Sequence, residues 1–206
     1  YPFIATLTTM MLNPIEPANV NKQFVMKNSK KIRNKSLLTT RGYLTGIYHH
    51  RNMAGAQDVV ERSMSINAKF LPRLKAAVEQ NALLRIGWTG SGEEVPKNGE
   101  VGLCPGIPEG ARIKALGKLG SWTSSFGAGG RFSVEGEVGS FFGAYNNGST
   151  VSSTGFIGRC GGFMMQEGTL FGSDGADTDL GMFMSDGVIY IQGQIGARLG
   201  NGMDGG

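Results

Sequence analysis

The chain has 206 residues, of which 17% are charged and 34 are glycine, and its formal net charge at pH 7 is +4. An apolar content of 40% is enough to bury a core in one or two domains, which excludes a disordered chain and a mini-protein. Glycine at more than twice its usual share of about 7%, without a G-X-Y period, excludes collagen and makes the spacing of glycines the informative feature.

The amino-terminal segment and the cysteines indicate the compartment. Residues 1–12 include Pro2, lack a basic lead and are too short to span a bilayer, so we expect no membrane anchor. Cys104 and Cys160 are far apart, which argues against a disulfide framework, a zinc site or an iron–sulfur cluster supplied by this chain alone. We expect reduced thiols and a cytoplasmic location. Because the chain starts on Tyr1 and stops within a repeat, we also expect a longer polypeptide.

Residues 17–57 form a basic segment with eight Lys or Arg residues and no Asp or Glu. Such a segment can grip nucleic acid, an anionic cofactor or an acidic protein surface. No recognised nucleic-acid motif accompanies the charge and aromatic residues are sparse, so we favour a solvated face or a contact with a protein partner over nucleic acid. The candidate partner-docking residues are Lys27, Lys30, Lys31, Arg33 and Lys35.

Two short helices are predicted after the basic segment, over residues 54–67 and 72–80. The second begins at Pro72, a favourable first helical residue, and places Leu74 and Val78 on one face. A strand is predicted over residues 83–88.

A linker and a domain boundary follow. Residues 89–108 are rich in glycine, proline and charge, as expected of a linker. We therefore predict a basic, partner-docking, mixed α/β segment over residues 1–110 and a glycine-repeat domain over residues 111–206.

The second half contains an internal repeat. Its template is G-x-x-G, a spacer, then G-x-x-M-x-x-G, with copies starting at residues 117, 136, 155, 172 and 193, 17 to 21 residues apart. β-rich stretches between the copies, at residues 132–135, 149–154, 169–171 and 188–192, predict strands. Short strands with glycine turns every ~19 residues predict a parallel β-helix, or solenoid, of about five coils.

The template residues are assigned to turns and to the inner stack rather than to chemistry, and no catalytic, cofactor or metal residue is predicted. The structural repeat residues are Gly136, Gly139, Gly155, Gly158, Gly162, Met165, Gly168, Gly172, Gly175, Gly181, Met184, Gly187, Gly193, Gly196, Gly200, Met203 and Gly206.

Residues 181–206 read as G-x-x-M-x-x-G-x-I-x-V-x-G-x-x-G, and three consecutive copies keep both the glycine frame and the Met. This pattern resembles the glycine-repeat (GXGXG) β-helix family found at the carboxyl end of the glutamate synthase large subunit and in a non-catalytic chain of formylmethanofuran dehydrogenase. The resemblance covers roughly the last 90 residues. It implies a right-handed β-helix that packs against catalytic domains and carries no cofactor of its own.

Catalytic and ligand motifs are poorly supported by the residues. His49 and His50 are adjacent and point apart, so they are poorly placed to share a metal ion. Residues 127–131 fail the dinucleotide fingerprint, and there is no P-loop and no G-x-S-x-G motif. The acidic residues of the repeat are spaced neither as an EF-hand nor as a calcium-binding nonapeptide. They are Asp174, Asp177, Asp179 and Asp186.

Three hypotheses for function follow. The first is a non-catalytic structural or assembly subunit, or domain, of a larger oxidoreductase complex, with other protein subunits as partners in a hetero- or homo-oligomer. The second is a self-assembling shell, filament or coat protein, because uncapped coils can stack. The third, weaker one is catalysis by the acidic cluster in a groove along the solenoid.

Overall fold

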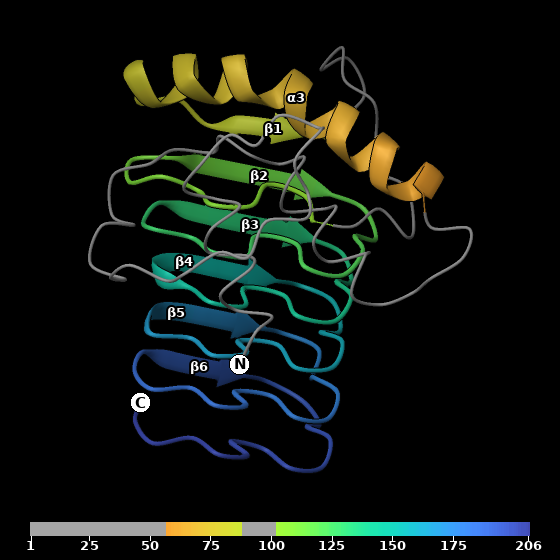
Figure 1. The fold of residues 1–206 in the computed structure, drawn as a ribbon, viewed down its shortest axis with the longest axis vertical. Helices are drawn as coiled ribbons and strands as arrows, with labels where there is room; N and C mark the ends of the chain where they lie inside the picture. The colour runs from red at the N-terminus through yellow and green to blue at the C-terminus, as the bar shows by residue number, and fades with distance from the viewer. Residues whose placement is uncertain (1–56, 88–101) are drawn as a thin grey trace, which may run out of the picture.

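The computed structural model describes residues 57–87 and 102–206. The helix α3 (Gln57–Glu79) precedes six strands that form one parallel sheet in sequence order. The strands are β1 (Leu84–Ile86), β2 (Arg112–Leu116), β3 (Arg131–Glu135), β4 (Asn147–Ser153), β5 (Glu167–Gly172) and β6 (Val188–Ile191). After each strand from β2 on, the chain loops back to the start of the next strand. The molecule is thus a β-solenoid with α3 lying across its β1 end (Figure 1).

The coils of the solenoid are in strict register. Ile113, Phe132, Val151, Leu170 and Ile189 are successive partners in the sheet, which sets the repeat at 19 residues. A second ladder on the turn side joins residues 119, 138, 157, 176 and 195 with the same period. The solenoid makes about four turns, so the predicted architecture is confirmed, with one coil fewer than the predicted five.

The core of the solenoid is the stack of inward side chains. Strands β2 and β3 share the burial pattern expected when every second residue points inward. The inward residues join one apolar cluster that runs from the helix to the fifth strand, for example Phe70, Ile86, Phe132 and Leu170. Because the interior is filled by side chains, the solenoid is a solid rod rather than a channel.

The two predicted helices are a single helix, α3, with Pro72 inside it. Ile66, Phe70 and Leu74 are buried at four-residue spacing, and this stripe continues past the proline. Proline inside a helix costs about 3 kcal/mol, whereas each buried apolar side chain contributes about 1.5–3 kcal/mol. Burial of the stripe against the first coil therefore outweighs the break.

The sheet begins before the predicted boundary near residue 110. Leu84 of β1 pairs with Ile113 of β2, so β1 already belongs to the solenoid. The N–H groups of Gly102 and Gly106 donate to the carbonyls of Ser121 and Ser125, 2.8 and 2.7 Å away. The described part of the predicted linker therefore forms coil structure, while residues 88–101 lie outside the described residues.

Candidate functional site: the open end of the solenoid

The turn side of each coil is built from residues with positive φ, and many of these are not glycine. One such column of equivalent residues has φ between 58° and 64° and consists of Trp122, Phe141, Cys160, Asp179 and Arg198. Left-handed backbone costs an L-residue about 1–2 kcal/mol. The strain is offset by hydrogen bonds between coils, such as the one from the N–H of Trp122 to the carbonyl of Ser140, 2.8 Å long.

Aromatic rings fill the same turns. Trp122 stacks on Phe141 with ring centroids 4.4 Å apart, and Phe126 stacks on Tyr145 at 4.9 Å. Further along, Phe163 meets Tyr145 edge-on at 5.5 Å. Aromatic pairs contribute about 0.5–1.5 kcal/mol beyond their burial, so this column stabilises the stack of coils. It was not predicted from the sequence, although alignment of the chain on a 19-residue period would bring these rings together.

Most of the predicted repeat residues occupy equivalent columns. Gly162, Gly181 and Gly200 continue one positive-φ column with φ between 63° and 67°. Gly187, with φ +102°, shows why glycine is needed: a Cβ there would lie 2.6 Å from Met165 Cε and 2.9 Å from the Gly168 carbonyl oxygen. At this position both the backbone conformation and the space exclude a side chain.

The fourth copy of the template is the exception. In the 19-residue register Gly172 pairs with Ile191 and Ser153 on the inward side of the sheet, so it is not a corner residue. A Cβ on Gly172 would lie 2.8 Å from the Cδ1 atoms of both Ile157 and Ile191. The glycine makes room for two large neighbours, and the copy starts at Asp174 instead. The predicted spacing of 17 to 21 residues is wrong for this reason.

The predicted methionines form one inner column. Met165 and Met184 are buried, whereas Met203, in the last coil, is 47% exposed. Asn146 stands one coil before them and is buried; its side chain accepts from the N–H of Ser149 at 2.9 Å and donates to the Ser149 carbonyl at 2.7 Å. The column is therefore structural until its last member, which lies at the free end.

The β1 end of the solenoid is closed by α3. The N–H of Cys104 donates to Asn67 Oδ1 at 2.8 Å, and Asn67 Nδ2 donates to the Gly102 carbonyl at 2.9 Å. One coil later, the corresponding N–H of Ser124 donates to the Leu103 carbonyl of the preceding coil. The Asn67 carboxamide thus takes the place of the coil that would precede the first one. Burial raises the pKa of the Cys104 thiol to about 12.

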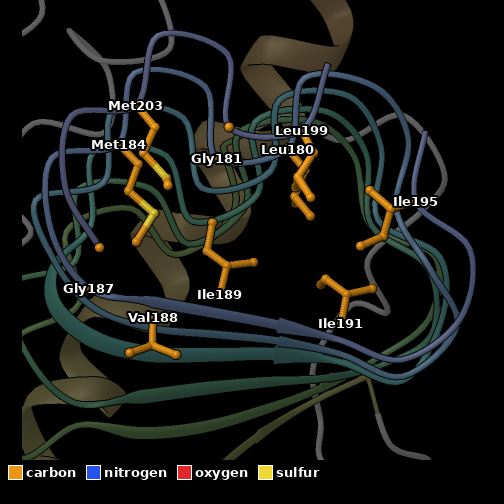
Figure 2. Close-up of a pocket in the computed structure, with 12 residues that line it drawn as sticks. Leu180, Gly181, Met184, Gly187, Val188, Ile189, Ile191, Ile195, Leu199 and Met203 are labelled. Atoms are coloured by element: carbon orange, nitrogen blue, oxygen red, sulfur yellow. The ribbon is translucent and has the colours of Figure 1, made fainter. Parts of the chain in front are cut away.

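The β6 end has no such cover among the described residues. An apolar groove of about 530 Å³ opens there, and in Figure 2 the side chains of the last two coils converge on it. Leu199 is 61% exposed, whereas Leu180, directly above it, is 1% exposed. The groove is lined by Leu180, Gly181, Met184, Gly187, Val188, Ile189, Ile191, Ile195, Leu199, Gly200, Met203 and Gly206.

The open end also presents backbone groups that are paired in every coil above. The N–H groups of Ala176, Asp179 and Phe183 donate to the last coil over 2.9–3.0 Å, and Ala176, Leu180 and Met184 accept from it. Within the described part of the chain, the equivalent groups of the last coil have no backbone partner. The donors are those of Ile195, Arg198 and Gly202, and the acceptors are those of Ile195, Leu199 and Met203.

The acidic residues of the repeat do not converge on a site. Asp179 is buried and accepts from Arg198 Nε and Nη2 at 2.7 and 2.6 Å. These hydrogen bonds, opposed by burial, hold the pKa of Asp179 below its usual range. Asp177 and Asp186 each accept from the N–H of the following residue at 2.7 Å. Over residues 57–87 and 102–206, no group of three or more His, Cys, Asp or Glu residues could hold a metal ion.

The other predicted site residues lie outside the described residues. They are His49, His50 and the basic set Lys27, Lys30, Lys31, Arg33 and Lys35. In the described ranges no helix has the length and apolar character needed to cross a membrane.

No protein-family model, no curated protein and no solved structure matches the chain. The functional argument therefore depends on the geometry of the solenoid and its two ends.

Proposed function

We propose that this chain is a non-catalytic assembly element of a larger oxidoreductase complex, of the glutamate synthase or formylmethanofuran dehydrogenase kind that its repeat resembles. In that role a right-handed β-helix acts in the cytoplasm as a rigid body against which catalytic subunits dock. The basic residues 17–57 add a second contact. The chain itself supplies no cofactor.

The observation that carries the proposal is the composition of the open-end groove. Catalytic pockets combine apolar walls with a few convergent polar or titratable side chains. Every side chain that lines this groove is aliphatic or a methionine. Such a surface can bury apolar area against another protein, but it offers no nucleophile, acid or base.

The solenoid is suited to hold partners at fixed positions. Each coil is bonded to the next on both the strand side and the turn side. Strands in such a sheet lie about 4.8 Å apart, so the distance between two surface points is set by the number of coils between them. A rigid spacer of this kind explains why the interior carries packing residues rather than functional ones.

Native mass spectrometry of the protein purified gently from its source tests the proposal. We expect companion subunits that carry flavin, iron–sulfur or metal centres, identified by peptide sequencing. Replacing Leu199 by Lys should weaken complexes that form through the open end, whereas Phe156→Lys, on the side of the solenoid, is the matched control. Turnover of a substrate by the purified chain alone would show that the proposal is wrong.

The second candidate function, self-assembly into a shell, filament or coat, is favoured by the uncovered last coil. Head-to-tail growth requires two open ends. Because α3 and Asn67 cover the β1 end, each added copy would have to displace the helix from Phe70 and its neighbours. This closure favours the assembly element over an open filament.

A further inference from the structure

We propose that the open end is a self-association surface, and that two copies of the chain dock through it, end to end, about a two-fold axis. This inference goes beyond the assembly role proposed above, because it names a second copy as the occupant of the groove and limits the assembly at this end to two. It does not require the oxidoreductase partner.

The surface that covers an open coil is defined by the coils above. The inner side chains of the β5 coil are covered by the β6 coil of the same chain, which leaves Leu180 and Met184 at 1% and 3% exposure. The equivalent Leu199 and Met203 are 61% and 47% exposed. A coil of this same chain therefore has the apolar side chains, at matching positions, that the open end lacks.

The backbone adds a second requirement. Unpaired donors of Ile195, Arg198 and Gly202 alternate with unpaired acceptors of Leu199 and Met203 around the last coil, in the part of the chain that the structure describes. The strand β6 is an edge of the sheet as well. Edge strands pair readily with a second edge, and pairing two copies of β6 antiparallel satisfies these groups with backbone groups of the partner.

The closed end decides the orientation. At the β1 end, α3 packs Ile66, Phe70 and Leu74 into the core, and Asn67 occupies the first coil's backbone groups. A second copy can therefore present only its own open end. An interface that uses the same patch on both copies is isologous and closes at two subunits.

The charge of the last coil permits such a contact. Residues 188–206 carry one cation, Arg198, and one anion, Asp204, so the coil is neutral although the whole chain has a net charge of +4. Arg198 is already held by Asp179. The preceding coil, residues 169–187, contains four Asp and no Lys or Arg, so two such coils would repel each other. Self-docking is thus favourable at the last coil and not one coil earlier.

Sedimentation velocity of the full chain over a range of micromolar concentrations tests the inference. We expect a monomer–dimer equilibrium without larger species. Leu199→Lys places two ammonium groups in the apolar interface and should weaken dimerisation by at least about 100-fold. Met203→Lys should do the same through a second side chain. The control Phe156→Lys changes an exposed residue away from the end and should leave the dimer intact.

Far-UV circular dichroism of each variant shows whether the solenoid is still folded, and both lysine positions are exposed in the monomer. A wild-type chain that stays monomeric at the highest concentration would overturn the inference, as would a Leu199→Lys chain that dimerises like wild type. Polymers beyond the dimer would also contradict the two-fold closure. A monomer that still co-purifies with enzyme subunits would remove the self-docking and leave the assembly role standing.

Discussion

Asn67 is the residue on which the closed end most depends. Its carboxamide is 6% exposed and bonds to two backbone groups of the first coil, the Cys104 N–H and the Gly102 carbonyl. Asn67→Ala leaves both groups buried without these bonds. An unsatisfied buried polar group costs about 1–3 kcal/mol, so the free energy of unfolding should fall by about 2–5 kcal/mol. Urea denaturation followed by circular dichroism measures this change.

Asn67→Asp separates the two hydrogen bonds. The new carboxylate still accepts from Cys104, but it faces the Gly102 carbonyl without a proton and is buried. Its protonated form can donate, so the pKa of the new carboxyl should be raised above the unfolded value of about 4. Because a raised acid pKa stabilises only the protonated form, the difference from wild type should be smallest below about pH 4 and grow as the pH rises through the raised pKa.

The control for this pair is Gln80→Glu, the same amide-to-acid change at an exposed residue beyond the end of α3. It should change the free energy of unfolding little. The interpretation of Asn67 as a substitute coil would be refuted if Asn67→Ala cost less than about 1 kcal/mol, the net value of a single ordinary hydrogen bond. A pH-independent difference between Asn67→Asp and wild type would refute it too.

Three further predictions concern the solenoid body. A thiol reagent at about pH 8 should label Cys160, which is partly exposed, and leave Cys104 unlabelled until unfolding, because burial raises the pKa of Cys104 to about 12; mass spectrometry counts the labels, and equal labelling of the native chain would contradict this. Asp179→Asn should lower the free energy of unfolding at neutral pH; because Arg198 holds the pKa of Asp179 below its usual range, wild type loses this contribution only as the pH falls through the lowered pKa, and urea denaturation in strongly acidic solution should show the gap closing. Phe142→Ala, at a side chain with 0% exposure, should lower the free energy of unfolding by about 3–5 kcal/mol in urea denaturation, and a loss below about 1 kcal/mol would show that the turn side is not packed.

The strands could be predicted because their signal is local. Residues 132–135 and 188–192 were expected as strands, and β3 and β6 cover 131–135 and 188–191. Alternating apolar residues and β-branched side chains mark such segments directly. The glycine frame likewise predicted a solenoid, since turn residues recur at a nearly constant spacing.

The register and the turn side could not be read from glycine alone. Asp174 stands in the fourth copy where other copies have glycine, and Gly172 lies inside the sheet, so a search for G-x-x-G shifts the frame by two residues. The positive φ of Trp122 and Phe141 is imposed by hydrogen bonds between coils. Local sequence carries no mark of such long-range constraints.

Asn67 had a signal that was overlooked. It lies beside Ile66 and one turn before Phe70, on the buried side of α3. A polar residue on a buried helix face needs hydrogen-bond partners, which points to contact with backbone or side-chain groups of another element. The identity of that element, and the fact that only one end of the solenoid is covered, depend on tertiary structure.

Hydrogen exchange of the backbone amides in the last two coils, measured at low and high protein concentration, tests the open end most directly. At low concentration the N–H groups of Ala176, Asp179 and Phe183 should exchange slowly, because the last coil accepts from them, whereas those of Ile195, Arg198 and Gly202 should exchange fast. At high concentration the last three should become protected as two open ends dock. Equal protection of both sets at low concentration, or no gain in protection at high concentration, would contradict an open end that serves as an assembly surface.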